Sequence, residues 1–297
     1  MTRVQVCETV MAESMAGLLA GREAAREGHL VELRLDGVHD ANVGVALAGR
    51  RRPAVVTCRP AWEGGRYRGD ESSRLDLLRE AVRHGAEFVD CEAAAGDVGL
   101  SGGGSRVVLS HHDFEETPRD LAARVQAIRA RRPDVLKVAV LARALMDCVR
   151  IRDAVRHDEG PRVVIAMGEA GVLSRVCPWL FGSCWSYAGH AAPGQPAVGE
   201  LVDEYRVTER TPASLVFGTA GSWERARPLA AAHNAAFRAR GCDALSVPLV
   251  TEDDDELRAV VAAFGLAGTV SAGQPGTPDE LRTRADRDVD RWTVTAF

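Results

Sequence analysis

The stretch RVVLSHHDF at 106–114 and the stretch DVLKVAV at 134–140 decide the fold of this chain. Both consist mainly of β-branched and other apolar residues, which is typical of buried strands. The sequence between them, TPRDLAARVQAIRA at 117–130, has a helical pattern. Two strands joined by one helix are expected to pair in parallel, because a parallel pair needs a crossover of a dozen or more residues. We therefore predict a βαβ unit that places Lys137 near the end of the first strand.

Lys137 is an unusual residue for an apolar strand, since Leu136 and Val138 flank it. Burial among apolar side chains disfavours the ammonium form and lowers the pKa of a lysine. An amine tuned in this way to about 7 to 8 is partly neutral and can attack a ketone to form a Schiff base. The alternative is an edge-strand lysine whose aliphatic stem lets the charge reach water. The strand by itself leaves both interpretations open.

The composition favours a globular protein with a sizeable core and no nucleic-acid surface. The 297 residues carry a net charge of −5, and the basic runs at 50–52 and 129–132 are short enough to be solvated faces. The amino terminus has no apolar signal region and no run of 18 apolar residues occurs, so we expect no membrane segment and a cytoplasmic location. The seven cysteines include no CxxC pair, and we expect no metal and no cofactor.

Strand and helix patterns alternate from residue 3 to about 205. Eight such repeats predict a (β/α)8 barrel, with an open doubly wound sheet as the competitor. Polar residues collect at or near the carboxyl ends of successive predicted strands, where a barrel builds its active site, and this favours closure. The expected strands are 3–10, 30–36, 53–59, 87–93, 106–114, 134–140, 162–168 and, less clearly, 182–189, and the strand-end residues are Glu32, Arg34, Arg59, Asp90, Glu92, His112, Lys137 and Met167.

Three motif-like stretches are assigned structural roles. SGGGS at 101–105 precedes a strand and lacks a following Lys and Ser/Thr pair, so we interpret it as a loop rather than a phosphate cradle. GTAGSWERA at 218–226 lacks the GxGxxG spacing. TEDDDE at 251–256 is expected to start a helix, with Thr251 as the N-cap and carboxylates in the first turn.

Residues 3 to about 205 resemble the type I 3-dehydroquinate dehydratases over the whole predicted barrel. Eight motifs in order make this resemblance specific. They are VELRLD at 31–36, VVTCR with EGG at 55–65, FVDCE at 88–92, LSHHDFEETP at 109–118, DVLKVAV at 134–140, MGEAGVLSR at 167–175, FGS at 181–183 and APGQ at 192–195.

The resemblance implies the removal of water from 3-dehydroquinate to give 3-dehydroshikimate. By this likeness Lys137 forms an iminium with the C3 ketone, which acidifies the C2 protons. His112 matches the general acid/base, and Glu63 matches the carboxylate that orients this histidine.

The resemblance also implies a set of substrate contacts. Arg175 and Gln195 match a clamp on the ring carboxylate, for which a guanidinium fork is suited. The remaining contacts are Glu32 and Arg59 at the ring hydroxyls, with Arg34 and Met167 at the mouth. Two departures are expected to weaken binding, because Ala191 stands where the family usually has a serine and the loop before APGQ is short.

The chain is expected to divide into a barrel at 1–207 and a smaller α/β segment at 208–297. HNAAF at 233–237 and LSVPLV at 245–250 resemble the opening of the substrate-binding domain of shikimate dehydrogenases. Arg227 and Leu229 replace two serines of that family and its catalytic lysine motif is absent, so we expect no dehydrogenase activity.

Two other functions remain open from the sequence. One is a non-catalytic binding or regulatory protein, which the joint presence of Lys137, His112 and Glu63 disfavours. The other is a different lysine-dependent barrel enzyme such as an aldolase, which the SHHDF and APGQ motifs disfavour. The expected partner is a small-molecule substrate, and the sequence is compatible with a homodimer.

Overall fold

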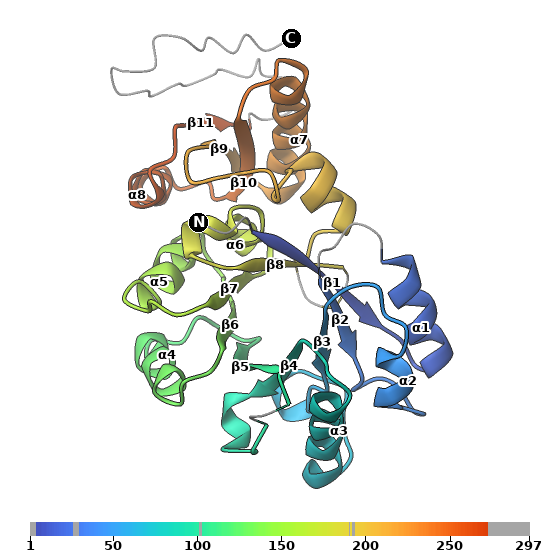
Figure 1. Cartoon of the computed structure of the whole chain (residues 1–297). Coiled ribbons are helices and arrows are strands. Elements are labelled where there is room, and N and C mark those ends of the chain that lie inside the picture. The colour runs from blue at the N-terminus through green and yellow to red at the C-terminus, as the bar shows by residue number, and fades with distance from the viewer. Residues whose placement is uncertain (1–3, 26–29, 101–102, 190, 192–193, 273–297) are drawn as a thin grey trace.

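The computed structural model describes residues 4–25, 30–100, 103–189, 191 and 194–272. Its first part is a barrel of eight parallel strands surrounded by helices (Figure 1). The strand order is β7-β6-β5-β4-β3-β2-β1-β8. The last gap is spanned by a bridge between Arg162 and Ser183 and by the amide of Cys184, which donates to the carbonyl of Arg162 at 2.9 Å. The (β/α)8 prediction is confirmed, and the open sheet is excluded.

All eight predicted strands are present, including the uncertain one near residue 185. They are β1 (Gln5–Met11), β2 (Leu30–Arg34), β3 (Ala54–Thr57), β4 (Phe88–Glu92), β5 (Arg106–Asp113), β6 (Val135–Leu141), β7 (Arg162–Met167) and β8 (Trp185–Ala188). The α-helices between them are α1 (Met15–Ala24), α2 (Val43–Leu47), α3 (Glu71–Arg83), α4 (Leu121–Ala130), α5 (Met146–Ala154) and α6 (Val172–Val176). Short 3-10 turns add η1 (Ala61–Glu63), η2 (Ala93–Ala95), η3 (Glu169–Gly171) and η4 (Pro178–Phe181), and a π-helical turn η5 (Glu200–Glu204) follows β8.

Successive side chains of each strand point to opposite faces of the sheet, so the buried apolar residues form two separate clusters. Side chains that point outward pack under the helices, whereas Val135 and Ala139 belong to a second cluster inside the barrel. Because side chains alternate along a strand, Lys137 lies on the same inward face as these two residues. The interior cluster contains Cys7, Leu30, Val55, Phe88, Val108, Val135, Ala139, Val163, Ile165, Met167, Trp185 and Tyr187.

The β5–α4–β6 unit has the predicted parallel pairing. Ser110 lies opposite Lys137, and His112 lies opposite Ala139. Since β6 pairs with β5 on one side and β7 on the other, Lys137 is not on an edge strand. The edge-strand interpretation of this lysine is therefore wrong.

A second α/β unit follows the barrel. It contains β9 (Leu215–Gly221), α7 (Trp223–Ala239), β10 (Ala244–Val250), α8 (Asp254–Phe264) and β11 (Gly268–Ser271), and its parallel strands have the order β10-β9-β11. The expected acidic first turn of α8 is present, but the predicted N-cap Thr251 is wrong. Asp253 caps the helix, because its side chain accepts from the amides of Asp255 and Glu256.

The second unit packs against the barrel beside α5 and α6 (Figure 1). The ring of Phe264 lies 5.2 Å from that of Phe181, measured between centroids, and the Arg152 guanidinium lies 4.6 Å from the Phe264 centroid. The Glu256 carboxylate accepts from the amide of Met146 at 2.8 Å. Arg227 forms an ion pair with Glu200 of η5 at 2.5 Å. The contact therefore combines apolar and charged groups.

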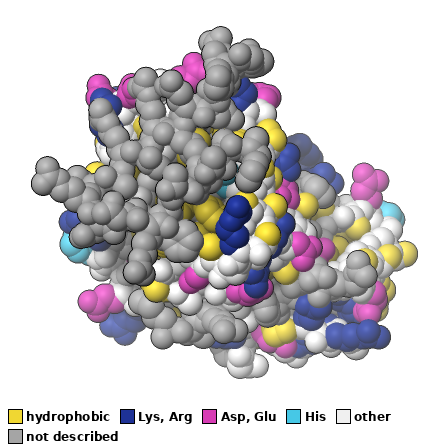
Figure 2. All heavy atoms as spheres, turned by 90° about the horizontal axis from the view of Figure 1, so that it is seen from above, with side chains coloured by type: hydrophobic (Ala, Val, Ile, Leu, Met, Phe, Trp, Pro, Cys, Tyr) yellow, Lys and Arg dark blue, Asp and Glu magenta, His cyan; other side chains and the backbone are white. Residues whose placement is uncertain are grey.

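Within the described ranges, no helix is both long and apolar enough to cross a membrane. On the face seen in Figure 2, basic and acidic side chains are interspersed rather than separated into fields of one sign. The loop assigned to SGGGS lies partly outside the described residues, at 101 and 102.

Candidate active site

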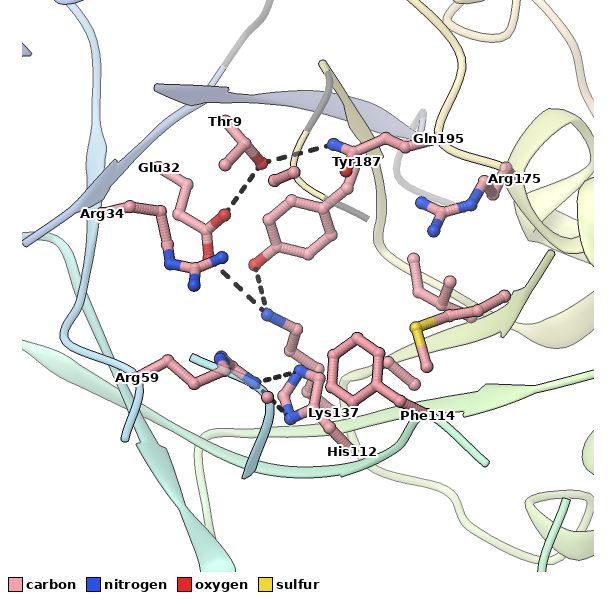
Figure 3. Close-up of a pocket in the computed structure, with 15 residues that line it drawn as sticks. Thr9, Glu32, Arg34, Arg59, His112, Phe114, Lys137, Arg175, Tyr187 and Gln195 are labelled. Carbon is pink, nitrogen blue, oxygen red and sulfur yellow. Dashed lines mark hydrogen bonds and ion pairs between the residues drawn. The ribbon is translucent and has the colours of Figure 1, made fainter. Parts of the chain in front are cut away.

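A pocket opens at the carboxyl ends of the barrel strands and contains most of the predicted site residues (Figure 3). Eight of the nine predicted positions line it, and Glu63 lies directly behind His112. The lining residues are Thr9, Glu32, Arg34, Arg59, Gly64, His112, Phe114, Lys137, Ala139, Ile165, Met167, Arg175, Tyr187, Ala191 and Gln195.

Lys137 is 5% exposed and its ammonium group has three neighbours. Its Nζ atom donates to Asp90 Oδ2 at 2.7 Å and to the Tyr187 hydroxyl at 3.3 Å. The Glu32 carboxylate lies 3.7 Å from the same nitrogen. Lys137 is also the single lysine among the 37 basic residues of the chain, since every other one is arginine.

The surroundings of Lys137 are only partly apolar, which corrects the prediction from the strand. Val135 and Ala139 pack along the inward face of β6, but two carboxylates lie beside the amine. Burial alone opposes ionisation of Asp90, yet the charges of Lys137 and Arg59 outweigh it and lower the pKa of Asp90 to about 2. The amine therefore lies in a polar environment on one side and an apolar one on the other.

His112 and Glu63 form the expected pair. Glu63 Oε1 lies 2.9 Å from His112 Nδ1 and accepts from the His112 amide at 2.9 Å. Burial, followed by the charges of Arg59 and Lys137, lowers the pKa of His112 well below its ordinary value. Burial raises the pKa of Glu63 to about 8, although the charge of Arg59 opposes this shift. The imidazole is therefore held neutral, which is the state required of a general base.

The two glycines of the EGG motif, Gly64 and Gly65, permit the tight turn that positions Glu63. Gly64 has a φ of 76°, and a Cβ atom there would overlap the ring of Phe114. A Cβ atom on Gly65 would overlap the backbone carbonyl of Arg59. The turn η1 can thus fold tightly against the end of β3 and direct Glu63 toward His112.

Arg175 is a buried cation that faces the pocket and has no counterion among the described residues. It is 2% exposed, and its Nε atom has no hydrogen-bond partner in the part of the chain that the structure describes. No carboxylate within the described ranges forms an ion pair with it, whereas Arg59 pairs with Asp90 at 3.2 Å. Burial lowers the pKa of Arg175 only to about 10, so the side chain stays charged at neutral pH. An unpaired buried guanidinium indicates a binding site for an anion.

The other predicted contacts occupy defined positions around the pocket. Glu32 accepts hydrogen bonds from Thr9 at 2.8 Å and Thr57 at 2.9 Å. Arg34 is held by both oxygens of Asp36, at 2.7 and 2.8 Å. Gln195 donates to Thr9 at 3.4 Å, Met167 is 1% exposed, and Arg59 contacts the ring of His112.

Several pocket residues were not predicted as site residues. Thr9, Phe114 and Tyr187 line the pocket, and Asp90 contacts Lys137 from behind the lining. Strand alternation could have indicated Tyr187, which lies two residues after the inward-facing Trp185. Glu92, one of the strand-end polar residues, instead accepts from Arg74 at 2.7 Å.

Comparison with known proteins identifies relatives of the barrel. The family model of type I 3-dehydroquinase matches residues 6–212. A 3-dehydroquinate dehydratase of Methanococcus maripaludis is 30% identical over 212 residues, which cover 66% of this chain and 96% of that protein. A solved 3-dehydroquinate dehydratase from Geobacillus kaustophilus has a TM-score of 0.62 and 27% identity, and covers 70% of this chain and 93% of the other.

Two bifunctional proteins match more of this chain. A chloroplastic 3-dehydroquinate dehydratase/shikimate dehydrogenase of Arabidopsis thaliana is 30% identical over 267 residues, or 84% of this chain, but this chain spans only 44% of that protein. The dehydroquinate dehydratase and shikimate dehydrogenase structure from S. pombe covers 93% of this chain and 57% of the other with a TM-score of 0.59, and at 20% identity it shows the fold alone. With the family match over residues 6–212 and the pocket at the expected barrel mouth, the chain belongs to the type I 3-dehydroquinase family.

Proposed function

We propose that this chain is a 3-dehydroquinate dehydratase, a hydro-lyase that converts 3-dehydroquinate to 3-dehydroshikimate and water in the shikimate pathway. The observation that carries the proposal is the arrangement of one buried amine, Lys137, with the His112–Glu63 pair and the unpaired Arg175 in the pocket of a family member. This set provides a nucleophile, a general base and an anion site, which the reaction requires.

Lys137 is the proposed nucleophile. Its neutral amine attacks the C3 ketone and, after loss of water, forms an iminium. The positive nitrogen withdraws electrons from C2 and makes a C2 proton more acidic. Burial of the side chain to 5% exposure limits competing hydrolysis by bulk water.

His112 is the proposed base that removes the C2 proton and then the acid that protonates the departing C1 hydroxyl. Its lowered pKa keeps it neutral before the reaction, and Glu63 at 2.9 Å holds Nδ1 in a fixed orientation. The charge of Arg59 next to the ring limits how long the imidazolium persists, which favours the second transfer.

The remaining lining residues are proposed to orient the substrate. Arg175 supplies the charge for the ring carboxylate, with Gln195 beside it, and Glu32 and Arg59 are proposed partners of the ring hydroxyls. Arg34 and Met167 complete the mouth. Ala191 lines the pocket where the family usually has a serine, so one hydrogen bond to the carboxylate is proposed to be missing.

The segment 208–297 is proposed to be a degenerate counterpart of the opening of a shikimate dehydrogenase, joined to a barrel at 1–207. Arg227 and Leu229 occupy the positions of two substrate-binding serines of that family, and Arg227 contacts Glu200. We propose that this segment has no dehydrogenase activity, so Arg227→Ser is not expected to create shikimate oxidation. A cytoplasmic location, a homodimer and the absence of nucleic-acid binding are part of the same proposal.

Borohydride trapping tests the function directly. The protein is incubated with 3-dehydroquinate, reduced and analysed by mass spectrometry, while enone formation is followed in parallel. Because Lys137 is the single lysine, one side-chain adduct is expected, and only the terminal amine needs to be distinguished from it. Lys137→Ala is expected to lose both adduct and turnover. Product formation at a normal rate by this variant would exclude the Schiff-base mechanism, and the absence of product and adduct from the parent would favour a binding protein.

A further inference from the structure

We propose that the hydroxyl of Tyr187 relays a proton from the Lys137 nitrogen to the oxygen of the attacked carbonyl during Schiff-base formation. The proposal rests on the proposed function, because it assigns an additional step to the same site. It gives a role to a residue of β8 that the mechanism above leaves unused.

Tyr187 contacts Lys137 through both its hydroxyl and its ring. The hydroxyl oxygen accepts from Lys137 Nζ at 3.3 Å, and the nitrogen lies 4.3 Å from the ring centroid (Figure 3). The side chain is fixed within the barrel, since the residue is 5% exposed and packs edge-on against Trp185. The hydroxyl is therefore held beside the nucleophile before substrate arrives.

The proton of the Tyr187 hydroxyl is available for a substrate. The oxygen accepts from Lys137, so its own O–H can point elsewhere. Over the described part of the chain, no side-chain or backbone acceptor receives it, and the residue lines the pocket. Burial raises the pKa of Tyr187 well above its ordinary value, so the hydroxyl retains its proton at neutral pH.

A relay at this position solves a geometric problem in carbinolamine formation. When the neutral amine attacks C3, the nitrogen–carbon bond forms and the carbonyl electron pair moves to oxygen, leaving nitrogen positive and oxygen negative. Direct transfer of a proton from nitrogen to oxygen needs a strained four-membered ring. With Tyr187 the ring has six members: the hydroxyl gives its proton to the oxygen and takes one from nitrogen. The products are a neutral carbinolamine and an unchanged tyrosine.

The other neighbours of Lys137 are unsuited to this step. Asp90 has a pKa lowered to about 2, so it carries no proton for the developing oxyanion. Glu32 accepts from Thr9 and Thr57 with its two oxygens. Among the described residues, Tyr187 is the one hydroxyl group in hydrogen-bond contact with the amine.

The test is the rate at which adduct forms on Tyr187→Phe, which keeps the ring and removes the hydroxyl. Parent and variant are mixed with a range of 3-dehydroquinate concentrations, quenched into borohydride at set times and analysed by intact mass, which the single lysine makes simple. Loss of a positioned proton donor is expected to lower the maximum trapping rate by about 100-fold. The half-saturating concentration is expected to stay within about twofold, because the relay acts after binding.

Tyr205→Phe is the matched control, because Tyr205 is also buried, at 1% exposure, but lies outside the pocket. This variant is expected to trap substrate at the parent rate, and thermal unfolding of each variant separates folding defects from chemical ones. A maximum rate for Tyr187→Phe within twofold of the parent would overturn the proposal. An effect confined to the half-saturating concentration would also overturn it and assign Tyr187 a packing role. Failure of the parent itself to form adduct would instead reject the proposed function.

Discussion

The site is built largely from charged side chains that are buried. Lys137, Asp90 and Arg59 are all buried, and each has an oppositely charged or polar neighbour within 3.2 Å. Buried ions are costly unless they are paired, so removing one member leaves its partner uncompensated. Arg175 differs from these residues because its counterion is expected to be the substrate.

The pH dependence of kcat/KM tests the state of His112. Burial and the charges of Arg59 and Lys137 lower the pKa of His112, so the neutral base persists below the usual range of histidine. Below the Glu63 transition near pH 8, kcat/KM is expected to show no further decline through about 6.5 and to fall again only at lower pH, because this parameter reports the free enzyme. A further decline centred at the ordinary histidine value would contradict the assignment of His112 as a buried, neutral base.

Arg175→Lys tests whether the unpaired guanidinium binds the substrate carboxylate. The charge is kept but the planar fork is lost, so KM is expected to rise by roughly 10- to 100-fold while kcat changes little, as a charge-assisted hydrogen bond contributes about 1.5–3 kcal/mol. Arg210→Lys is the control, since this arginine is also buried but pairs with Asp243 at 3.0 Å outside the pocket. Equal KM values for the parent and Arg175→Lys would exclude the proposed contact.

Among the elements, the strands position most of the site, the turn η1 positions Glu63, and the helix α6 positions Arg175. Ser110 and His112 face inward from β5, while Lys137 faces inward from the adjacent β6. The turn η1 then brings Glu63 against His112, although 49 residues separate them in the chain. The strand β6 is buried along most of its length, whereas the turn depends on its glycines.

Gly65→Ala is expected to disturb the site through this turn. The added Cβ would overlap the carbonyl of Arg59, so both Arg59 and Glu63 must move, and kcat is expected to fall by at least about tenfold. Gly96→Ala is the matched control, since Gly96 also follows a short turn, has a φ of 77° and has open space around its Cβ. That change is expected to cost about 1–3 kcal/mol of stability, since a φ of 77° with a ψ of −163° is a conformation that glycine alone readily adopts, and to leave kcat unchanged. Similar kcat losses in both variants would show that the tight approach at Gly65 is not what positions the site.

At the scale of the whole molecule, the second unit covers barrel surface that would otherwise face water. Phe264 of α8 packs on Phe181, and Arg152 of α5 lies over the same ring. Arg238 of α7 also donates to the carbonyls of Asp203 and Glu204, each at 3.1 Å, in the turn that follows the barrel. The two units are therefore expected to stabilise each other.

Phe264→Ala tests this mutual stabilisation. Removal of a ring buried to 8% exposure is expected to lower the free energy of unfolding by about 3 kcal/mol, with the trapping activity at 25 °C retained. Leu215→Ala is the control, because Leu215 is 40% exposed and its loss is expected to change stability by at most about 0.5 kcal/mol. Chemical denaturation of each variant is monitored by fluorescence, which gives the free energy of unfolding, and by trapping activity, which gives the midpoint for the loss of activity. An unchanged midpoint for the loss of activity would show that the barrel does not depend on the second unit.

The sequence by itself determined the repeating architecture and the family to which the barrel belongs. Alternating strands and helices are local patterns, so all eight strands could be predicted, and the ordered motifs located Lys137, His112 and Glu63. The N-cap of α8 was misplaced because Thr251 and Asp253 both suit a cap, and only the backbone path decides which one meets the free amides. Local sequence patterns therefore predict which helices and strands form more accurately than they predict the residue at which each one begins or ends.

Only the tertiary structure decided what surrounds each functional group. Asp90 and Tyr187 meet Lys137 across 47 and 50 residues of sequence, so the strand DVLKVAV alone predicted an apolar setting. Arg175 has no counterion among the residues that the structure describes, and this too depends on barrel closure, which brings α6 and the strand ends to one mouth. Electrostatic environment is a sum over neighbours in space, and in a barrel most of those neighbours are distant in the chain.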